Sequence, residues 1–253
     1  MRFSSLGSGS KGNATVVHHG DTFLLIDCGF SVKETEKRLS LLGLQVRDLS
    51  GIAVTHEHSD HIRGVPSLAK KYQLPVLMTA GTHKSLKSDV DIDLSFIESD
   101  ISFSLGDLEV TPVSVAHDAR EPVQFVIRGG QMVLGILTDL GCVTPHVLEN
   151  YRFCHGLLVE CNHDTDMLAM GPYPPSLKHR VGGEWGHLNN QQTKYLLQNI
   201  QTEQLQQLVI GHISQKNNSL DLVKKVMSDV NVQTTDIQYA SQDEGFSWIE
   251  LIP

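Results

Sequence analysis

The segment Thr55-His56-Glu57-His58-Ser59-Asp60-His61 places three imidazoles and a carboxylate close together, directly after the apolar run Gly51-Ile52-Ala53-Val54. Imidazole nitrogen suits zinc, manganese and iron, and carboxylate oxygen suits harder divalent ions. The mixture therefore predicts a catalytic divalent-metal site instead of a Cys-rich structural zinc site. The alternative is that these are ordinary surface or core histidines, which the density of candidate ligands in one short loop disfavours.

The spacing within this segment separates its candidate ligands into two pairs. His56 and His58 are two residues apart, so an extended backbone points both side chains to the same side. Asp60 and His61 fall on the following turn and can face a second ion. The segment therefore predicts two adjacent metals, and such a centre needs more ligands than one loop provides.

Further candidate ligands follow three other apolar runs. His117 comes after residues 108–116, Asp139 after residues 131–138, and His212 after residues 205–211. Each run is strand-like, and loops at the ends of strands in a rigid sheet often carry catalytic groups. We therefore expect these three side chains to complete the centre.

The order His-x-His-x-Asp-His followed by His, Asp and His resembles the signature of the metallo-β-lactamase superfamily over nearly the whole chain. The resemblance implies two divalent ions per chain, Zn²⁺ or Mn²⁺, with Fe²⁺ as a further option. It implies these ligands: His56, His58 and His117 for the first ion, Asp60, His61 and His212 for the second, and Asp139 as the bridge. It also implies that Asp27 orients a ligand histidine from behind, although Asp27 could instead be a turn residue ahead of Gly29.

The resemblance further implies an α/β (α+β) fold, the αββα sandwich, in which helices flank two packed, mixed β-sheets. Apolar patterns predict strands near residues 14–18, 22–27, 51–55, 75–79, 108–115, 123–128, 132–138, 156–160, 208–212, 236–240 and 246–251. Helical patterns lie near residues 31–42, 62–72, 144–150, 189–199 and 219–228. Strands in both halves with helices between them are expected for such a sandwich.

Composition is that of one compact enzyme. The 253 residues are 40% hydrophobic, and residues 1–253 contain no linker, repeat or low-complexity tract, so we expect a single domain. The apolar runs are far shorter than the roughly 18 residues needed to cross a bilayer. The first residues lack a secretory apolar region, and the four cysteines show no CxxC pairing. We therefore expect a cytoplasmic protein with reduced thiols.

The glycine-rich segment Gly7-Ser8-Gly9-Ser10-Lys11-Gly12 has the letters of a dinucleotide-binding fingerprint. Such a fingerprint must open a helix whose N-terminus holds the phosphates. Residues 14–18 read as a strand instead. The segment is therefore expected to join two strands, with Lys11 or the glycine amides near a substrate phosphate.

The bridging residue and two later segments bear on the substrate. A bridging aspartate in place of a cysteine gives oxygen-rich coordination, and two adjacent metals suit in-line attack at phosphorus. Residues 159–164 (VECNHD) and 186–190 (GHLNN) resemble the YycJ-like (WalJ-like) branch of the superfamily, which is related to the PhnP phosphodiesterases and shares a plan with ribonuclease Z. The chain departs from the branch pattern at Cys161, Asn189, Gly211 and Ile213, none of which is an implied metal ligand.

The resemblance places His187 beside the metals and Glu160 behind His187. An imidazole of near-neutral pKa can protonate a departing alkoxide, and a carboxylate partner favours its charged form and fixes its tautomer. His187 is thus the expected general acid and His163 the competing candidate. Either histidine could instead hold its own loop by hydrogen bonds. The expected catalytic residues are Asp60, Glu160, His163 and His187.

A polar cluster follows the last metal histidine. Ser214, Asn217 and Asn218 match the branch pattern there, which implies a substrate-phosphate site before the helix near residue 219. An equally weighted alternative is that Asn218 caps that helix.

The net charge of −9 argues against broad electrostatic capture of nucleic acid. Local cations could still form a basic rim, unless they are simply a solvated surface: Lys11, Lys178, His179, Arg180 and Lys216.

The sequence thus predicts a dinuclear metal-dependent hydrolase that cleaves phosphodiester bonds. The YycJ-like resemblance implies a nuclease with 5′–3′ exonuclease action on single-stranded DNA ends, with RNA as the other polymer. A small-molecule cyclic phosphodiesterase is the main alternative, followed by a thioester or lactone hydrolase and, least favoured, a non-enzymatic binding module. The expected partner is nucleic acid and not a membrane. The oligomeric state stays open, a homodimer being one option.

Overall fold

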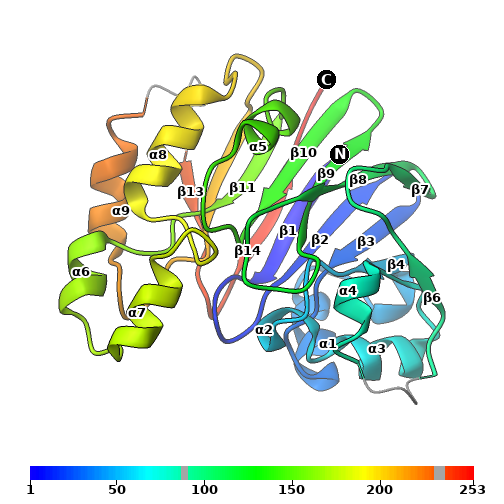
Figure 1. Cartoon of the computed structure of the whole chain (residues 1–253). Helices are drawn as coiled ribbons and strands as arrows, with labels where there is room; N and C mark the ends of the chain where they lie inside the picture. Colours follow the sequence, from blue (N-terminus) through cyan, green and yellow to red (C-terminus); the bar gives the residue numbers. More distant parts are fainter. Residues whose placement is uncertain (87–90, 231–236) are drawn as a thin grey trace.

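The computed structural model describes residues 1–86, 91–230 and 237–253. Within these residues the strands form two seven-stranded sheets (Figure 1). The first sheet contains, from edge to edge, β14 (Phe246–Glu250), β1 (Arg2–Gly7), β2 (Ala14–His19), β3 (Thr22–Ile26), β4 (Gly51–Ala53), β5 (Val76–Met78) and β6 (Leu94–Phe96). The second contains β13 (Ile237–Tyr239), β12 (Gln207–Gly211), β11 (Gly156–Glu160), β10 (Met132–Leu137), β9 (Val123–Gly129), β8 (Leu108–Ser114) and β7 (Phe103–Leu105).

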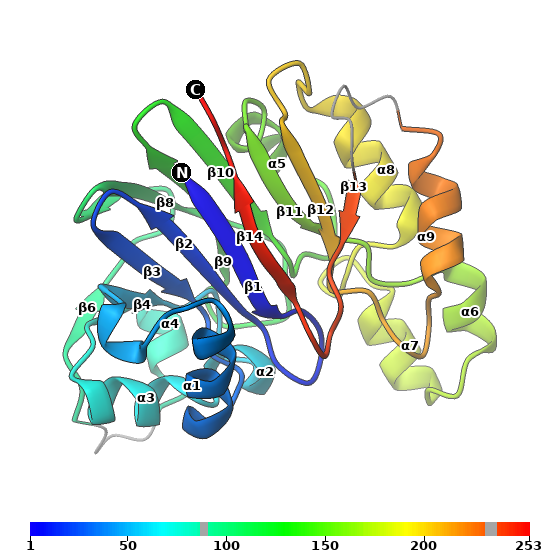
Figure 2. The same cartoon turned by 180° about the vertical axis from the view of Figure 1, so that it is seen from behind.

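Helices lie outside both sheets (Figures 1 and 2). Beside the first sheet are α1 (Val32–Leu41), the 3₁₀ helix η1 (Val46–Asp48), α2 (Ser59–Ile62), α3 (Val65–Tyr72) and α4 (Ala80–His83). Beside the second sheet are α5 (Pro145–Asn150), α8 (Asn190–Asn199) and α9 (Leu220–Met227). The short helices α6 (Thr165–Met170) and α7 (Pro175–Val181) follow β11. The order of layers is helix, sheet, sheet, helix, which confirms the predicted αββα sandwich.

The core has three apolar layers because the central strands are buried on both faces. In β3, Leu24 packs between the sheets and Leu25 packs against the helices of the first sheet. In β11, Leu158 packs between the sheets and Leu157 against the helices of the second sheet. Strands buried on both faces are continuously apolar, which is why the sequence reveals them.

The strand directions bring the functional loops together. In the first sheet β1, β3, β4 and β5 run in one direction, and in the second β8, β10, β11 and β12 do so. Each sheet therefore presents several carboxyl ends at one edge, the place where open α/β sheets bind their ligands. The loops that follow β3, β4, β8, β10, β11 and β12 carry the candidate site residues.

Each predicted strand is present with ends shifted by a few residues; residue 236 of the segment 236–240 lies outside the described residues. The sequence patterns missed β1, β6, β7, η1, α2, α4, α6 and α7. β1 shows no apolar pattern in the sequence because Ser4 and Ser5 are polar, although both are buried in the structure. The Ser4 hydroxyl donates a hydrogen bond to the carbonyl of Phe246 at 2.6 Å. β6 and β7 are three-residue strands, too short to show a pattern.

The helix predicted over residues 62–72 is present as α3, but it begins three residues later than predicted. The structure has α2 ending at Ile62 and α3 beginning at Val65. Between them the Gly64 amide donates to the Cys28 carbonyl at 2.8 Å, and a Cβ at residue 64 would lie 1.9 Å from the Phe30 carbonyl oxygen. This close approach of two backbones interrupts the helix, and helical periodicity cannot foresee it.

The glycine-rich loop joins β1 to β2, two antiparallel strands, as expected. Because a strand follows the loop, the dinucleotide-binding interpretation is excluded. Membrane insertion through a helix also finds no support in the described part of the chain, where every helix is too short or too polar to span a bilayer.

Candidate metal centre

Three imidazoles converge at the first group of candidate ligands. His58 Nδ1 lies 3.0 Å from His56 Nε2 and 3.2 Å from His117 Nε2. The opposite nitrogens are occupied: His56 Nδ1 lies 2.9 Å from the Thr55 hydroxyl, and His117 Nδ1 donates to the Gly186 carbonyl at 2.9 Å. Such outer partners fix the tautomer and turn the inner nitrogens toward a common point. The structure thus brings His56, His58 and His117 together as the resemblance implied.

Burial keeps His56 and His117 in the neutral form that binds metal. Desolvation lowers the pKa of His56 well below its usual value and lowers the pKa of His117 to about 4. A neutral imidazole is the form that coordinates a metal ion. At neutral pH these two rings are therefore ready ligands.

The second group comprises Asp60, His61 and His212. Asp60 Oδ2 lies 3.6 Å from His61 Nε2 and 4.0 Å from His212 Nε2. Asp60 and His61 sit in α2, and His212 follows β12 with a backbone φ of 49°. This left-handed conformation is costly for a non-glycine residue and persists only where the surroundings enforce it. Here it turns the chain at the end of the strand.

Asp27 holds His61 from behind. Its carboxylate lies 2.7 Å from His61 Nδ1 and accepts hydrogen bonds from the Thr55 amide and hydroxyl, both at 2.8 Å. Asp27 also has a φ of 61°, so the turn role considered from the sequence and the orienting role coincide in one residue. The His61 ring is therefore fixed with Nε2 facing the second group.

Asp139 contacts the second group and lies within 4.8 Å of a ring nitrogen of His56 in the first group. Its Oδ2 lies 2.7 Å from His61 Nε2, and its Oδ1 lies 3.0 Å from His212 Nδ1. Burial disfavours the charged carboxylate, but His212 and His61 outweigh burial and hold the pKa of Asp139 well below its usual value. Asp139 Oδ2 and His212 Nδ1 are buried without a well-formed hydrogen bond. Buried, ionised and incompletely bonded donors of this kind fit divalent ions.

His187 and Glu160 form a pair beside Asp139. His187 Nδ1 lies 3.0 Å from Glu160 Oε2 and 3.1 Å from Asp139 Oδ1. Burial lowers the pKa of His187, but the two carboxylates outweigh burial and raise the pKa to about 10. Glu160 is fully buried at the end of β11, where its Oε1 accepts the amide of Leu140 at 2.8 Å. The carboxylate is thus fixed, and it fixes the imidazole.

His163 is placed differently. Its side chain is buried, its Nδ1 has no hydrogen-bond partner, and it does not line the cavity above the ligands. Desolvation lowers its pKa to about 4. The residue forms an isolated bridge with Asn189, so its position is that of a loop-packing group.

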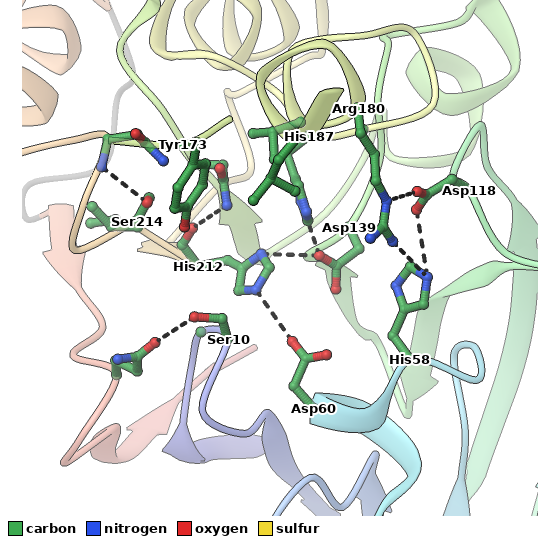
Figure 3. A pocket seen from close by; sticks show the side chains of 18 of the residues that line it. Ser10, His58, Asp60, Asp118, Asp139, Tyr173, Arg180, His187, His212 and Ser214 are labelled. Carbon is green, nitrogen blue, oxygen red and sulfur yellow. Dashed lines mark hydrogen bonds and ion pairs between the residues drawn. The ribbon is translucent and has the colours of Figure 1, made fainter. Parts of the chain in front are cut away.

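A cavity of about 310 Å³ opens over the ligands (Figure 3). Arg180, Asp118 and His58 lie on one side of it, with Tyr173 and Ser214 on the other. The lining residues are Gly9, Ser10, His58, Ser59, Asp60, Asp118, Asp139, Asn162, Tyr173, Leu177, Arg180, Val181, Gly186, His187, His212, Ile213, Ser214, Asn217 and Gln242. Of the proposed basic rim, Arg180 lines the cavity, whereas Lys11, Lys178, His179 and Lys216 do not.

The three candidate phosphate residues have different surroundings. Ser214 and Asn217 line the cavity, and both amide atoms of Asn217 are buried without a partner. Asn218 is buried away from the cavity, where its Nδ2 donates to the carbonyls of Cys161 and Asn162 at 3.0 and 3.2 Å. The helix cap is Ser219, whose hydroxyl accepts the amide of Leu222. Asn218 is therefore neither the cap nor a cavity residue.

Sequence reasoning missed Asn13 and Asp118. Asn13 Nδ2 lies 3.0 Å from His61 Nε2 and 3.3 Å from Asp60 Oδ2. Asp118 Oδ1 lies 3.5 Å from His58 Nε2. Asn13 belongs to the glycine-rich loop, which the sequence connected only with substrate phosphate. The position of Asp118 directly after His117 was a signal that could have been used.

Comparison with known proteins agrees with this geometry. Residues 22–213 match the family described as "Beta-lactamase superfamily domain". The chain is 36% identical over 235 residues to "Exodeoxyribonuclease YycJ" of Bacillus anthracis, covering 91% of this chain and 89% of that protein. It is 31% identical over 233 residues to "Exodeoxyribonuclease WalJ" of Streptococcus pneumoniae, covering 90% and 87%.

A solved structure shows the same fold at low identity. The metallo-β-lactamase fold protein YhfI from Bacillus subtilis has a TM-score of 0.76 and 16% identity, covering 98% of this chain and 99% of that one. The family model and the two relatives confirm the family inferred from the order of histidines and aspartates. The chain belongs to the metallo-β-lactamase superfamily, in the family that includes YycJ and WalJ.

Proposed function

We propose that the protein is a metal-dependent phosphodiesterase that degrades nucleic acid from its ends, as a 5′–3′ exonuclease on single-stranded DNA. One observation carries the proposal: the carboxylate of Asp139 contacts His61 and His212 of the second ligand group and also His187 of the proton-donating pair. Chemistry at a metal-bound phosphoryl group and protonation of its leaving group can then occur side by side. The names of the two full-length relatives, both exodeoxyribonucleases, favour a DNA substrate.

The donor set supports two divalent ions, Zn²⁺ or Mn²⁺, with Fe²⁺ as a further option. His56, His58 and His117 would hold one ion, Asp60, His61 and His212 would hold the other, and Asp139 would be shared. When bound, such a pair supplies an activated water and offsets the charge on the attacked phosphoryl group. Asp27 would keep the His61 ring in its ligating orientation.

His187 is the proposed general acid. Its Nδ1 faces Glu160 and Asp139, which leaves Nε2 as the atom that can give a proton to a departing alkoxide. Glu160 favours the charged imidazole and fixes its tautomer. The competing residue, His163, does not line the cavity, and we assign it no proton transfer.

Several wider properties belong to the same proposal. Ser214 and Asn217 are proposed to contact substrate phosphate because both line the cavity.

A single domain over residues 1–253 is supported by the pairing of β1 with β14, the first and last strands of the described residues. A cytoplasmic location is supported by four free thiols, Cys28, Cys142, Cys154 and Cys161. A monomer and a homodimer are equally compatible with this function.

A metal-titrated activity panel tests the function. It compares 5′-phosphorylated single-stranded DNA, RNA, a cyclic phosphodiester, a thioester and a lactone, each rate being divided by the metal bound. We expect phosphodiesters to be cleaved at least about tenfold faster than the thioester or lactone. DNA should lose nucleotides from its 5′ end. A faster thioester or lactone reaction, or full activity with only trace metal, would overturn the proposal.

A further inference from the structure

Arg180 is the one lysine or arginine among the described residues that line the metal-centre cavity. It lies near the end of α7, and its side chain is 56% exposed. Figure 3 shows the guanidinium on one side of the cavity, beside Asp118 and His58. A polyanionic substrate that enters this cavity therefore meets one guanidinium of the chain, in addition to the His187 imidazole and any bound metal.

An ion pair, not packing, fixes this guanidinium. Helix α7 has no buried residue, so the hydrophobic core does not position Arg180. Arg180 Nε donates to Asp118 Oδ2, and Arg180 Nη2 lies 3.4 Å from His58 Nε2. Asp118 directly follows the candidate ligand His117, so it ties Arg180 to the rigid end of the metal centre.

The guanidinium stands outside the ligand group. His58 directs Nδ1 toward His56 and His117, whereas Arg180 contacts Nε2 on the other side of the His58 ring. Arg180 is thus separated from His58 Nδ1 by the width of the imidazole and a further 3.4 Å contact. It lies beside the ligand group and within the same cavity, where it can meet a part of the substrate next to the phosphoryl group held at the metal centre.

The chemistry of the free N–H groups identifies the ligand. A guanidinium has five N–H donors, and Asp118 accepts from Nε, so the terminal nitrogens can still donate. Their planar fork matches two oxygens of a phosphate. We propose that Arg180 binds the phosphate next to the scissile one, so that the site selects nucleic-acid chains over small single phosphodiesters. This inference rests on the proposed phosphodiesterase function and adds a specificity-determining residue to it.

Arg180→Gln tests the inference on two substrates. A single-stranded oligodeoxynucleotide has a neighbouring phosphate, and bis(p-nitrophenyl) phosphate has none. The kcat/KM on the oligonucleotide should fall by about 10–100-fold, the scale of a lost charge-assisted hydrogen bond, mainly through KM. The slope of log(kcat/KM) against log(salt) should decrease by about one. The rate on bis(p-nitrophenyl) phosphate should change by less than about twofold, and the bound metal should be unchanged.

Two further variants sharpen the comparison. Arg180→Lys keeps the charge but loses the fork, so its oligonucleotide KM should fall between those of wild type and Arg180→Gln. Arg47→Gln makes the same chemical change at an exposed position of η1 outside the cavity and should leave both substrates unaffected.

Other outcomes would overturn the inference. Equal losses on both substrates would place Arg180 at the scissile phosphate, loss of metal would make it structural, and unchanged oligonucleotide kinetics would remove it from binding. A wild-type protein that cleaves neither phosphodiester would overturn the proposed function itself. An active wild type with an unaffected Arg180→Gln variant would overturn only the role of Arg180.

Discussion

Glu160 Oε2 lies 3.0 Å from His187 Nδ1, although the two residues are 27 positions apart in the chain. Glu160 is fully buried at the end of β11, and its other oxygen accepts the amides of Leu140 and Leu188 at 2.8 and 3.2 Å. The carboxylate therefore cannot turn away. It sets the tautomer of an imidazole whose side chain is still 20% exposed to the cavity, which is the arrangement expected of a positioned general acid.

His187→Ala should keep the metals and the fold but reduce turnover of an oligonucleotide by about 10²–10⁴-fold, the usual scale for a general acid. Bis(p-nitrophenyl) phosphate should be affected far less, because nitrophenolate departs without a proton. Steady-state rates on both substrates and elemental analysis measure this. Glu160→Gln should show the same selectivity more weakly. Equal losses on both substrates would remove His187 from the acid role.

Asp139→Ala should lose metal and activity together, because its carboxylate contacts His61 and His212 of the second group and its charge would offset that of the two proposed ions. Elemental analysis should find about two ions per chain in the wild type and fewer than about one in the variant. Asp229→Ala removes an exposed carboxylate and serves as the control. Retention of both metals by Asp139→Ala would contradict the shared-ligand role.

Asn13→Ala should weaken the second metal site selectively. Asn13 Nδ2 donates to Asp60 Oδ2 at 3.3 Å and lies 3.0 Å from His61 Nε2, both residues of the second group. Loss of such a supporting contact usually costs about 10–100-fold in metal affinity. A competitive chelator titration should show one weakened and one unchanged binding step. Lys11→Ala, an exposed residue of the same loop, should leave both steps unchanged; equal weakening of both steps in Asn13→Ala would refute the selectivity.

His163 should make the metal-free protein sensitive to acid. Burial lowers its pKa from 6.5 to about 4 in the folded state. Because the unfolded chain takes up the proton first, stability is lost as pH falls from about 6.5 to about 4, by roughly 2–3 kcal/mol. His163→Gln cannot titrate there, so its free energy of unfolding should decline less than that of wild type between pH 7 and pH 4. Parallel curves in urea titrations would contradict this assignment.

Local pattern predicted most of the strands, and the family resemblance carried by the order of histidines and aspartates implied the αββα fold and the candidate ligands. Strands such as β10 and β11 are buried on both faces, so their continuous apolar runs are visible in the sequence. The cluster at residues 56–61 is dense because one loop contributes candidate ligands to both groups. His117, Asp139 and His212 each stand within three residues of the end of a strand, so the position of each could be inferred from its own segment.

The tertiary structure alone decided which other polar residues join the centre. Asn13 reaches Asp60 and His61 across 47 and 48 positions of chain, and Arg180 reaches His58 across 122. The Asn218 side chain is instead buried away from the cavity, where it donates hydrogen bonds to the carbonyls of Cys161 and Asn162. Hydrophobic periodicity reports only whether a segment is buried and on which face. A hydrogen bond between distant loops depends on how the two sheets pack, and no local run of residues encodes that distance.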